Sequence, residues 1–185
     1  MGTVEEWAIL KNLVGVILKY VPGCIVEIGC GVSTYILAEH AKSHGVKFYT
    51  CDTQWGKLEK IKKNIGYDNL IPFHGRSISF IETFNDTPSV VFIDGDHNAK
   101  VVRKEVNFFL DKLNIGGVLF LHDTCPWKET VESKQKKGRT VDTYLVRKEL
   151  EQNKDFDVFT WRYTAAFCGL TMVLKKDMSE PEYRR

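Results

Sequence analysis

The sequence has 185 residues, which is enough for one folded domain to bury its own core without disulfide or metal support. Its 43% hydrophobic and 27% charged residues are ordinary for a soluble globular protein. The formal net charge of +2 gives no bulk field that would attract nucleic acid or an anionic membrane, so neither partner is indicated.

The cysteines and the beginning of the sequence bear on the compartment. The five cysteines are odd in number and none is spaced C-x-x-C, which favours a reduced intracellular environment over a disulfide framework. The apolar run from Leu13 to Val21 follows acidic residues instead of a basic segment, is too short to span a bilayer, and is interrupted by Lys19. We therefore expect a cytoplasmic protein without a targeting or membrane segment.

Helical and strand-like patterns alternate along the chain. Apolar residues recur at helical spacing from Val4 to Leu18, which predicts an N-terminal helix over 1–21 that Pro22-Gly23 ends. The other predicted helices are 33–44, with Ser33 or Thr34 as its N-cap, 55–64, 101–113 and 141–152. Apolar runs predict strands at 24–29, 47–53, 69–75, 116–124, 156–163 and 168–176, and a strand that runs into a turn at 89–97.

This alternation predicts an α/β fold. Strands followed by helices favour a doubly wound, Rossmann-like and mostly parallel sheet, and the last two strands favour an antiparallel hairpin at its end. Pro72 predicts an edge position for the third strand. The polar segment 126–140 predicts a mobile loop, or simply a solvated connection. No linker divides the chain, so we expect a single domain over 1–185.

Small and polar residues follow the apolar runs, where an open α/β sheet binds its ligands. They are Glu27 to Ser33, Asp52-Thr53-Gln54, Gly75 to Ser77, Asp94 to His97 and His122-Asp123-Thr124. Gly29 and Gly31 would let the backbone approach a ligand at a helix N-terminus. A dinucleotide motif has a third glycine where Thr34 stands, and Glu27 adds a negative charge that suits the amino group of S-adenosylmethionine better than a diphosphate. The alternative is a tight strand–helix turn without a ligand.

Three further residues complete the predicted adenosine site. Asp52 lies at the end of the second strand, where a carboxylate can accept both ribose hydroxyls; otherwise it is an N-cap of the next helix. Ser77 could meet the adenine edge and Trp55 could stack on adenine, while Trp127 could meet a substrate. For both tryptophans, ordinary packing is the alternative.

The motifs EIGCGVST, YTCDTQ, HGRSIS, FIDGDHNAKVVRKEV, GGVLFLHDT and CGLTMVLKK, in this order, resemble class I S-adenosylmethionine-dependent methyltransferases over nearly the whole chain. The resemblance is greatest to the small-molecule O-methyltransferase-like group whose strands end in Asp-Gly-Asp-His and His-Asp. It implies a seven-stranded sheet in the order 3-2-1-4-5-7-6. The expected cofactor-binding residues are Glu27, Gly29, Cys30, Gly31, Ser33, Asp52, Thr53, Ser77 and Asp94.

The same resemblance implies the catalytic residues. In catechol-type relatives, carboxylates at the positions of Asp94 and Asp123 hold a magnesium ion, and the residue at the position of His97 deprotonates the substrate hydroxyl. His122 departs from the pattern, because an acidic residue or its amide is usual there and imidazole is a poor ligand for Mg²⁺. The alternative is that Asp94 and Asp96 cap the following helix and His97 is merely exposed.

Three functions are compatible with these patterns. We expect a methyltransferase that modifies a hydroxyl of a small-molecule metabolite, with magnesium assistance left open and a homo-oligomer also left open. The second reading is a catalytically inactive binding or scaffold protein with a methyltransferase fold. The third, a dehydrogenase, is disfavoured by Thr34 and Glu27.

Overall fold

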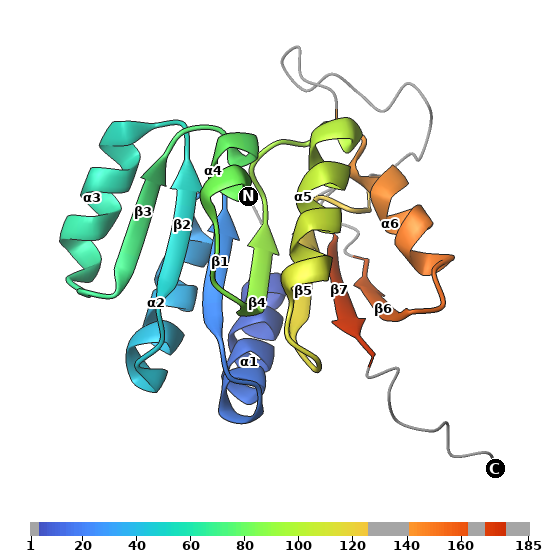
Figure 1. The fold of residues 1–185 in the computed structure, drawn as a ribbon, viewed down its shortest axis with the longest axis horizontal. Coiled ribbons are helices and arrows are strands. Elements are labelled where there is room, and N and C mark those ends of the chain that lie inside the picture. The colour runs from blue at the N-terminus through green and yellow to red at the C-terminus, as the bar shows by residue number, and fades with distance from the viewer. Residues whose placement is uncertain (1–3, 126–140, 163–168, 177–185) are drawn as a thin grey trace.

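Seven short strands and six helices form the described part of the chain, residues 4–125, 141–162 and 169–176 of a computed structural model (Figure 1). The strands are β1 Cys24–Ile28, β2 Phe48–Asp52, β3 Leu70–His74, β4 Pro88–Ile93, β5 Val118–His122, β6 Phe156–Trp161 and β7 Leu170–Lys175. The helices are α1 Val4–Tyr20, α2 Val32–His44, α3 Trp55–Ile65, α4 Ser77–Thr83, α5 Ala99–Lys112 and α6 Thr143–Glu151.

The strands form one sheet in the order β3-β2-β1-β4-β5-β7-β6, as the resemblance implied. β1 to β5 are parallel, and β7 is antiparallel to both β5 and β6. β3 lies at one edge, which confirms the position predicted from Pro72. Because β1 and β4 are central neighbours whose connections run to opposite sides, the loops that follow them meet at the carboxyl edge of the sheet, where ligands bind in such folds.

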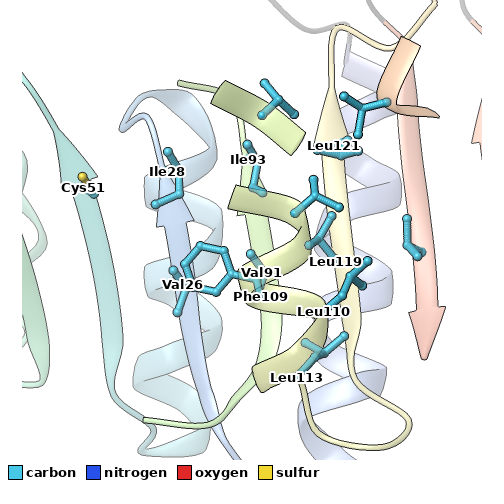
Figure 2. Packing of buried hydrophobic residues seen from close by; sticks show 14 of the residues in the cluster. Val26, Ile28, Cys51, Val91, Ile93, Phe109, Leu110, Leu113, Leu119 and Leu121 are labelled. Carbon is cyan, nitrogen blue, oxygen red and sulfur yellow. The ribbon is translucent and has the colours of Figure 1, made fainter. Parts of the chain in front are cut away.

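The core has two layers, one on each face of the sheet. Successive strand residues point to opposite faces, so Val26 and Ile28 of β1 join the cluster beneath α4, α5 and α6, while Ile25 joins the cluster beneath α1, α2 and α3. Figure 2 shows Phe109 and Leu110 of α5, and Leu113 directly after it, packed on the first face. Because both layers are well packed, the carboxyl ends of the strands, where the candidate site lies, are held in defined positions.

Two boundaries differ from the predicted ones in ways that matter for the site. The segment 89–97, predicted as a strand that runs into a turn, is a strand only as far as Ile93, so Asp94 and His97 lie in the turn before α5. The segment after β3, for which no element is predicted, contains the short helix α4, which begins at Ser77. Its Phe80 packs in the core beside Phe109, and this tertiary contact stabilises a helix too short for a clear periodic pattern.

Some predictions fall outside the described residues. They include the predicted loop 126–140 with Trp127, the last residue of the predicted strand 156–163 and the first residue of the predicted strand 168–176. Within the described ranges, no helix is both long enough and apolar enough to cross a membrane.

Candidate active site

The turn after β1 brings two strand ends into direct contact. Gly29 has a φ of +89°, and a Cβ there would lie 2.7 Å from both the Asp94 carbonyl carbon and the Gly95 Cα. Only glycine fits this backbone and this close approach. Gly31 differs, because its φ is –174° and a Cβ there would meet nothing within 4 Å. Gly29 is therefore required by the backbone geometry. Gly31 borders open space at the N-terminus of α2, where a ligand can approach.

Glu27 anchors this turn from within the protein. Its side chain is fully buried and accepts hydrogen bonds from the hydroxyls of Ser33 at 2.6 Å, Thr34 at 2.8 Å and Thr50 at 2.6 Å. Burial raises the pKa of Glu27 to about 7, and the three hydroxyls oppose that rise. The structure thus gives Glu27 an internal structural contact; its predicted attraction for a cofactor amino group stays a prediction.

The N-cap predicted for the second helix is wrong. The helix begins at Val32 with Gly31 as its N-cap, and Thr34 lies in the first turn, where its hydroxyl accepts from the Gly31 N–H at 2.7 Å. The hydroxyls of Ser33 and Thr34 both donate to the buried Glu27 carboxylate instead of capping the helix. The sequence pattern did not indicate this contact.

Asp52, the last residue of β2, binds the turn that follows β1. Its carboxylate accepts from the Cys30 N–H at 3.2 Å and the Gln54 N–H at 2.9 Å, and it pairs with Lys57 at 3.0 Å. Burial opposes ionisation, but these donors lower the pKa of Asp52 below its usual value. The N-cap of α3 is Gln54, so Asp52 is not the cap. Its side chain is only 9% exposed, and its ribose contact stays a prediction.

The remaining predicted adenosine residues lie around these two turns. Cys30 is buried against Asp52, Ser33 is buried beneath the turn, and Thr53 is exposed, with its carbonyl oxygen 3.1 Å from His74 Nε2. Trp55 is half exposed and its ring centroid lies 5.5 Å from that of His74. Ser77, at the start of α4, is nearly buried, so little of its hydroxyl is accessible to a ligand in this conformation.

Beneath Ser77 lies a buried carboxylate that no sequence pattern had singled out. Glu105 of α5 is fully buried, and neither of its oxygens has a hydrogen-bond partner among the described residues. Burial raises the pKa of Glu105 to about 7; the Ser77 hydroxyl offsets this only in part, and Asp96 adds to it. A buried carboxylate without a hydrogen bond of good geometry costs stability, and protonation removes the part of that cost that comes from its charge.

We expect Glu105→Gln to stabilise the protein increasingly as the pH rises. A pKa raised from 4.5 to about 7 means that the folded state binds the extra proton, so stability present below pH 4.5 is lost as the pH passes through 7. The shift corresponds to about 3 kcal/mol at most. Urea unfolding of both proteins between about pH 5 and about pH 8 measures the difference. A difference in unfolding free energy that stays constant with pH would contradict this account.

The turn after β4 and the end of β5 bring together the predicted catalytic residues. His97 Nε2 lies 3.3 Å from Asp123 Oδ2, and donor atoms of Asp94, His97 and Asp123 all lie within 4.8 Å of one another. The three side chains are partly exposed, at 21–27%. The backbone of His97 is fixed as well, since its carbonyl accepts from the Asp142 N–H at 2.9 Å. The alternative of a merely exposed His97 is therefore wrong.

The helix-capping alternative for the two carboxylates is only half right. Asn98 is the N-cap of α5, and its side chain accepts from the Lys100 N–H. Asp96 accepts from the Asn98 N–H at 2.9 Å and so supports that cap, whereas Asp94 pairs with His122. Asp123 has a φ of +56° and is the sole non-glycine residue with a positive φ in the described ranges. Such conformations occur at sites where the surroundings hold a side chain in place.

Two site residues were missed by sequence reasoning and lie on α1. Glu6 is fully buried; its Oε2 lies 3.6 Å from His122 Nε2, and its Oε1 accepts from the Gly169 N–H at 3.1 Å. Trp7 stacks on the His122 ring at a centroid distance of 5.6 Å and an angle of 9°. The sequence does contain a pattern that indicates a buried Glu6. It lies four residues before Leu10, on the same helix face as Val14 and Leu18, and these three apolar residues are buried.

Magnesium fits this arrangement poorly. His122 Nδ1 lies 3.2 Å from Asp94 Oδ1 and 3.5 Å from Asp123 Oδ1, and His97 occupies the other Asp123 oxygen. The third nearby donor is an imidazole nitrogen, whereas Mg²⁺ prefers an octahedron of oxygen ligands. The carboxylates predicted as metal ligands are thus already paired with histidine rings.

Comparisons with known proteins agree with the fold and the motifs. A family model described as a methyltransferase domain matches residues 26–124, which span β1 to the end of β5 and contain most of the site. No curated protein matches the sequence.

Solved structures match over almost the whole chain at low sequence identity. An O-methyltransferase from Bacillus cereus in complex with SAH is 13% identical, with a TM-score of 0.73, covering 95% of this chain and 83% of that one. TomG, an O-methyltransferase from Streptomyces achromogenes in complex with SAM, is 16% identical, with a TM-score of 0.73 and coverages of 96% and 82%. An rRNA methylase from Streptococcus thermophilus is 15% identical, with a TM-score of 0.67 and coverages of 91% and 95%.

Proposed function

Since the chain belongs to the methyltransferase-domain family and has the class I S-adenosylmethionine-dependent fold, we propose that it methylates a hydroxyl group of a small-molecule metabolite. The observation that carries the proposal is the His97–Asp123 pair at the carboxyl edge of the sheet. A methyl transfer to oxygen requires a base that takes the hydroxyl proton, and histidine is the usual base at neutral pH.

The residues around the first two strand ends suit the proposed cofactor. Open space borders Gly31 at the N-terminus of α2, and the carboxylates of Glu27 and Asp52 lie beneath and beside it. S-adenosylmethionine, when bound, supplies a methyl group on a positively charged sulfur and leaves as S-adenosylhomocysteine. Glu27 keeps the turn in shape for the methionine part, and Asp52 supplies the carboxylate for the ribose hydroxyls.

In the proposed reaction, His97 is the base and Asp123 holds its ring in position. His97 Nε2 lies 3.3 Å from Asp123 Oδ2, and in the proposed reaction Nε2 carries the hydrogen of the ring, which leaves Nδ1 to take the acceptor's proton. His97 would take the proton of the acceptor hydroxyl as that oxygen receives the methyl group that S-adenosylmethionine would supply, and it would hold the proton until release. A partner of this kind holds the imidazole in one tautomer and stabilises its charged form.

Ligand-dependent thermal unfolding tests the cofactor. A ligand at about a hundred times its dissociation constant adds about 2.7 kcal/mol, which corresponds to a rise of about 5–10 °C in Tm for a chain of this size. We expect this rise with S-adenosylmethionine and S-adenosylhomocysteine and none with NAD, the control. The absence of a rise with both adenosyl compounds would contradict the proposal.

The acceptor is tested separately, because cofactor binding does not depend on it. Release of S-adenosylhomocysteine is measured with a panel of phenols, catechols and hydroxy acids, each paired with the analogue that lacks the hydroxyl. We expect turnover only with hydroxylated members. Equal turnover of the paired analogues, or methylation of an amine alone, would refute the assignment to oxygen.

A further inference from the structure

The buried carboxyl group of Glu105 has no role in the proposed reaction. It lies on the same buried face of α5 as Val102, Val106 and Phe109, and none of its surface is exposed. Neither of its oxygens has a hydrogen bond of good geometry among the described residues. Buried polar groups in proteins nearly always have a hydrogen-bond partner, so the position of this carboxyl group needs an explanation.

The polar neighbours of Glu105 come from the ends of three strands. Ser77 begins α4 after β3, and Asp96 lies in the turn after β4. Both interact with the Glu105 carboxyl group, and so does Cys51, which is next to the last residue of β2. Glu105 therefore lies beneath the edge of the sheet at which Asp52 and Ser77 are predicted to bind adenosine.

Few of these neighbours have a hydrogen to offer Glu105. The Cys51 thiol donates to the Gly75 carbonyl at 3.5 Å. An ionised Asp96 only accepts hydrogen bonds. Among these neighbours, the Ser77 hydroxyl is the donor that remains, and it offsets part of the effect of burial on the Glu105 carboxyl group.

This shortage of donors determines how Ser77 can meet a ligand. A hydroxyl has one hydrogen and two lone pairs, so a Ser77 hydrogen that is drawn toward Glu105 leaves only lone pairs for the ligand. Ser77 keeps 9% of its surface exposed, and one lone pair needs little of it. The amino group of adenine has N–H donors that fit such an acceptor. The carbonyl oxygen of a 6-oxo purine is itself an acceptor and would be repelled.

We propose that Glu105 makes the cofactor site select adenine over a 6-oxo purine, because it holds the Ser77 hydroxyl as an acceptor for the adenine amino group. Glu105 is a positioning residue, since it is fully buried and acts through Ser77. The inference rests on the proposed function, which supplies the adenosyl cofactor. It concerns binding alone and is tested without turnover.

The first test compares two ligands that differ at one position of the purine. Calorimetry measures the binding of S-adenosylhomocysteine and of S-inosylhomocysteine, which has a carbonyl oxygen in place of the amino group. A buffer at about pH 8.5 keeps Glu105 ionised, because its pKa is raised to about 7 by burial. We expect the adenosyl compound to bind about 10- to 100-fold more tightly, since an unpaired buried acceptor is costly. Equal affinities would overturn the proposal.

The second test removes the charge of Glu105. The amide of Glu105→Gln can donate to the Ser77 oxygen, which frees the hydroxyl hydrogen for a carbonyl oxygen. We expect the preference for the adenosyl compound to fall at least about fivefold, mainly through tighter binding of the inosyl compound. Asp111→Asn, which neutralises an exposed carboxylate on the same helix, should leave the preference as in wild type. An unchanged preference in Glu105→Gln would show that the carboxylate does not set it.

A double-mutant cycle establishes whether Glu105 acts through Ser77. We expect Ser77→Ala to remove most of the preference, and Glu105→Gln to have no further effect in that background. If Glu105→Gln changes the preference equally with and without Ser77, the carboxylate acts on the purine by another route and the proposal is wrong.

Failure of the proposed function has a different signature. If neither compound binds to the wild-type protein, the proposed cofactor is wrong and the inference about Glu105 falls with it. If S-adenosylhomocysteine binds and the preference is absent or independent of Glu105, the cofactor stands and the inference alone is overturned.

Discussion

Replacing His97 with glutamine is expected to lower kcat by about 10²- to 10⁴-fold, the usual contribution of a general base, while leaving the affinity for S-adenosylmethionine unchanged. Glutamine keeps much of the volume and can still donate to Asp123, but its amide cannot take the proton of the acceptor hydroxyl. Steady-state kinetics give kcat, and calorimetry gives the cofactor dissociation constant.

Two companion variants make this result interpretable. Asp123→Asn keeps the shape of the carboxylate but not its charge, so it should lower kcat through the tautomer and orientation of His97. His44→Gln removes an exposed imidazole at the end of α2 and should have no effect. If His97→Gln and Asp123→Asn both turn over some hydroxylated acceptor at the wild-type rate, His97 is not the base.

Alanine at Gly29 is expected to destabilise the fold by about 2–5 kcal/mol, from the strain of a positive φ together with overpacking against the turn after β4. The collision is with the backbone of Asp94 and Gly95, which cannot swing aside as a flexible side chain could. Chemical denaturation of the ligand-free protein measures the loss.

Gly31→Ala is the matched control with the opposite outcome. Its extended backbone and the open space around it leave the unfolding free energy within about 0.5 kcal/mol of wild type. If the cofactor enters that space, the added methyl group should weaken S-adenosylmethionine binding by roughly tenfold, or about 1.4 kcal/mol. Unchanged affinity would move the cofactor away from Gly31, whereas an equal destabilisation by both substitutions would contradict the distinction between the two glycines.

The architecture could be predicted because it depends on short apolar runs and their order. Residues of the central strands are buried on both faces, so β1, β4 and β5 appear in the sequence as mainly hydrophobic segments, with Glu27 and His122 as buried exceptions. The polar residues after these segments, including Asp94, His97 and Asp123, could likewise be expected at one edge. The helix α4 could not, because its seven residues are stabilised by Phe80 in the core instead of by a periodic pattern.

The supporting residues of the site were harder to predict, because their partners are distant in sequence. Glu6 and Glu105 each interrupt an apolar helix stripe, which signals a buried charge but does not identify what the charge faces. Only the packing of α1 against the end of β5 places Glu6 beside His122. For the same reason, the hydroxyls of Ser33 and Thr34 pointed to a helix cap in the sequence, while in the fold they bind Glu27.

The contact between Glu6 and the backbone of Gly169 joins positions 163 residues apart in the sequence. Contacts of such long separation form late, because the intervening chain must be ordered first. During synthesis, Glu6 of α1 therefore cannot accept the Gly169 N–H until the segment that leads into β7 has been made. The contact of Glu6 with His122 is complete only then. A ribosome-bound chain that ends before β7 could fold much of its parallel sheet and still lack a finished catalytic edge. Activity in this protein would then depend on β7 having been made and packed against the rest of the sheet.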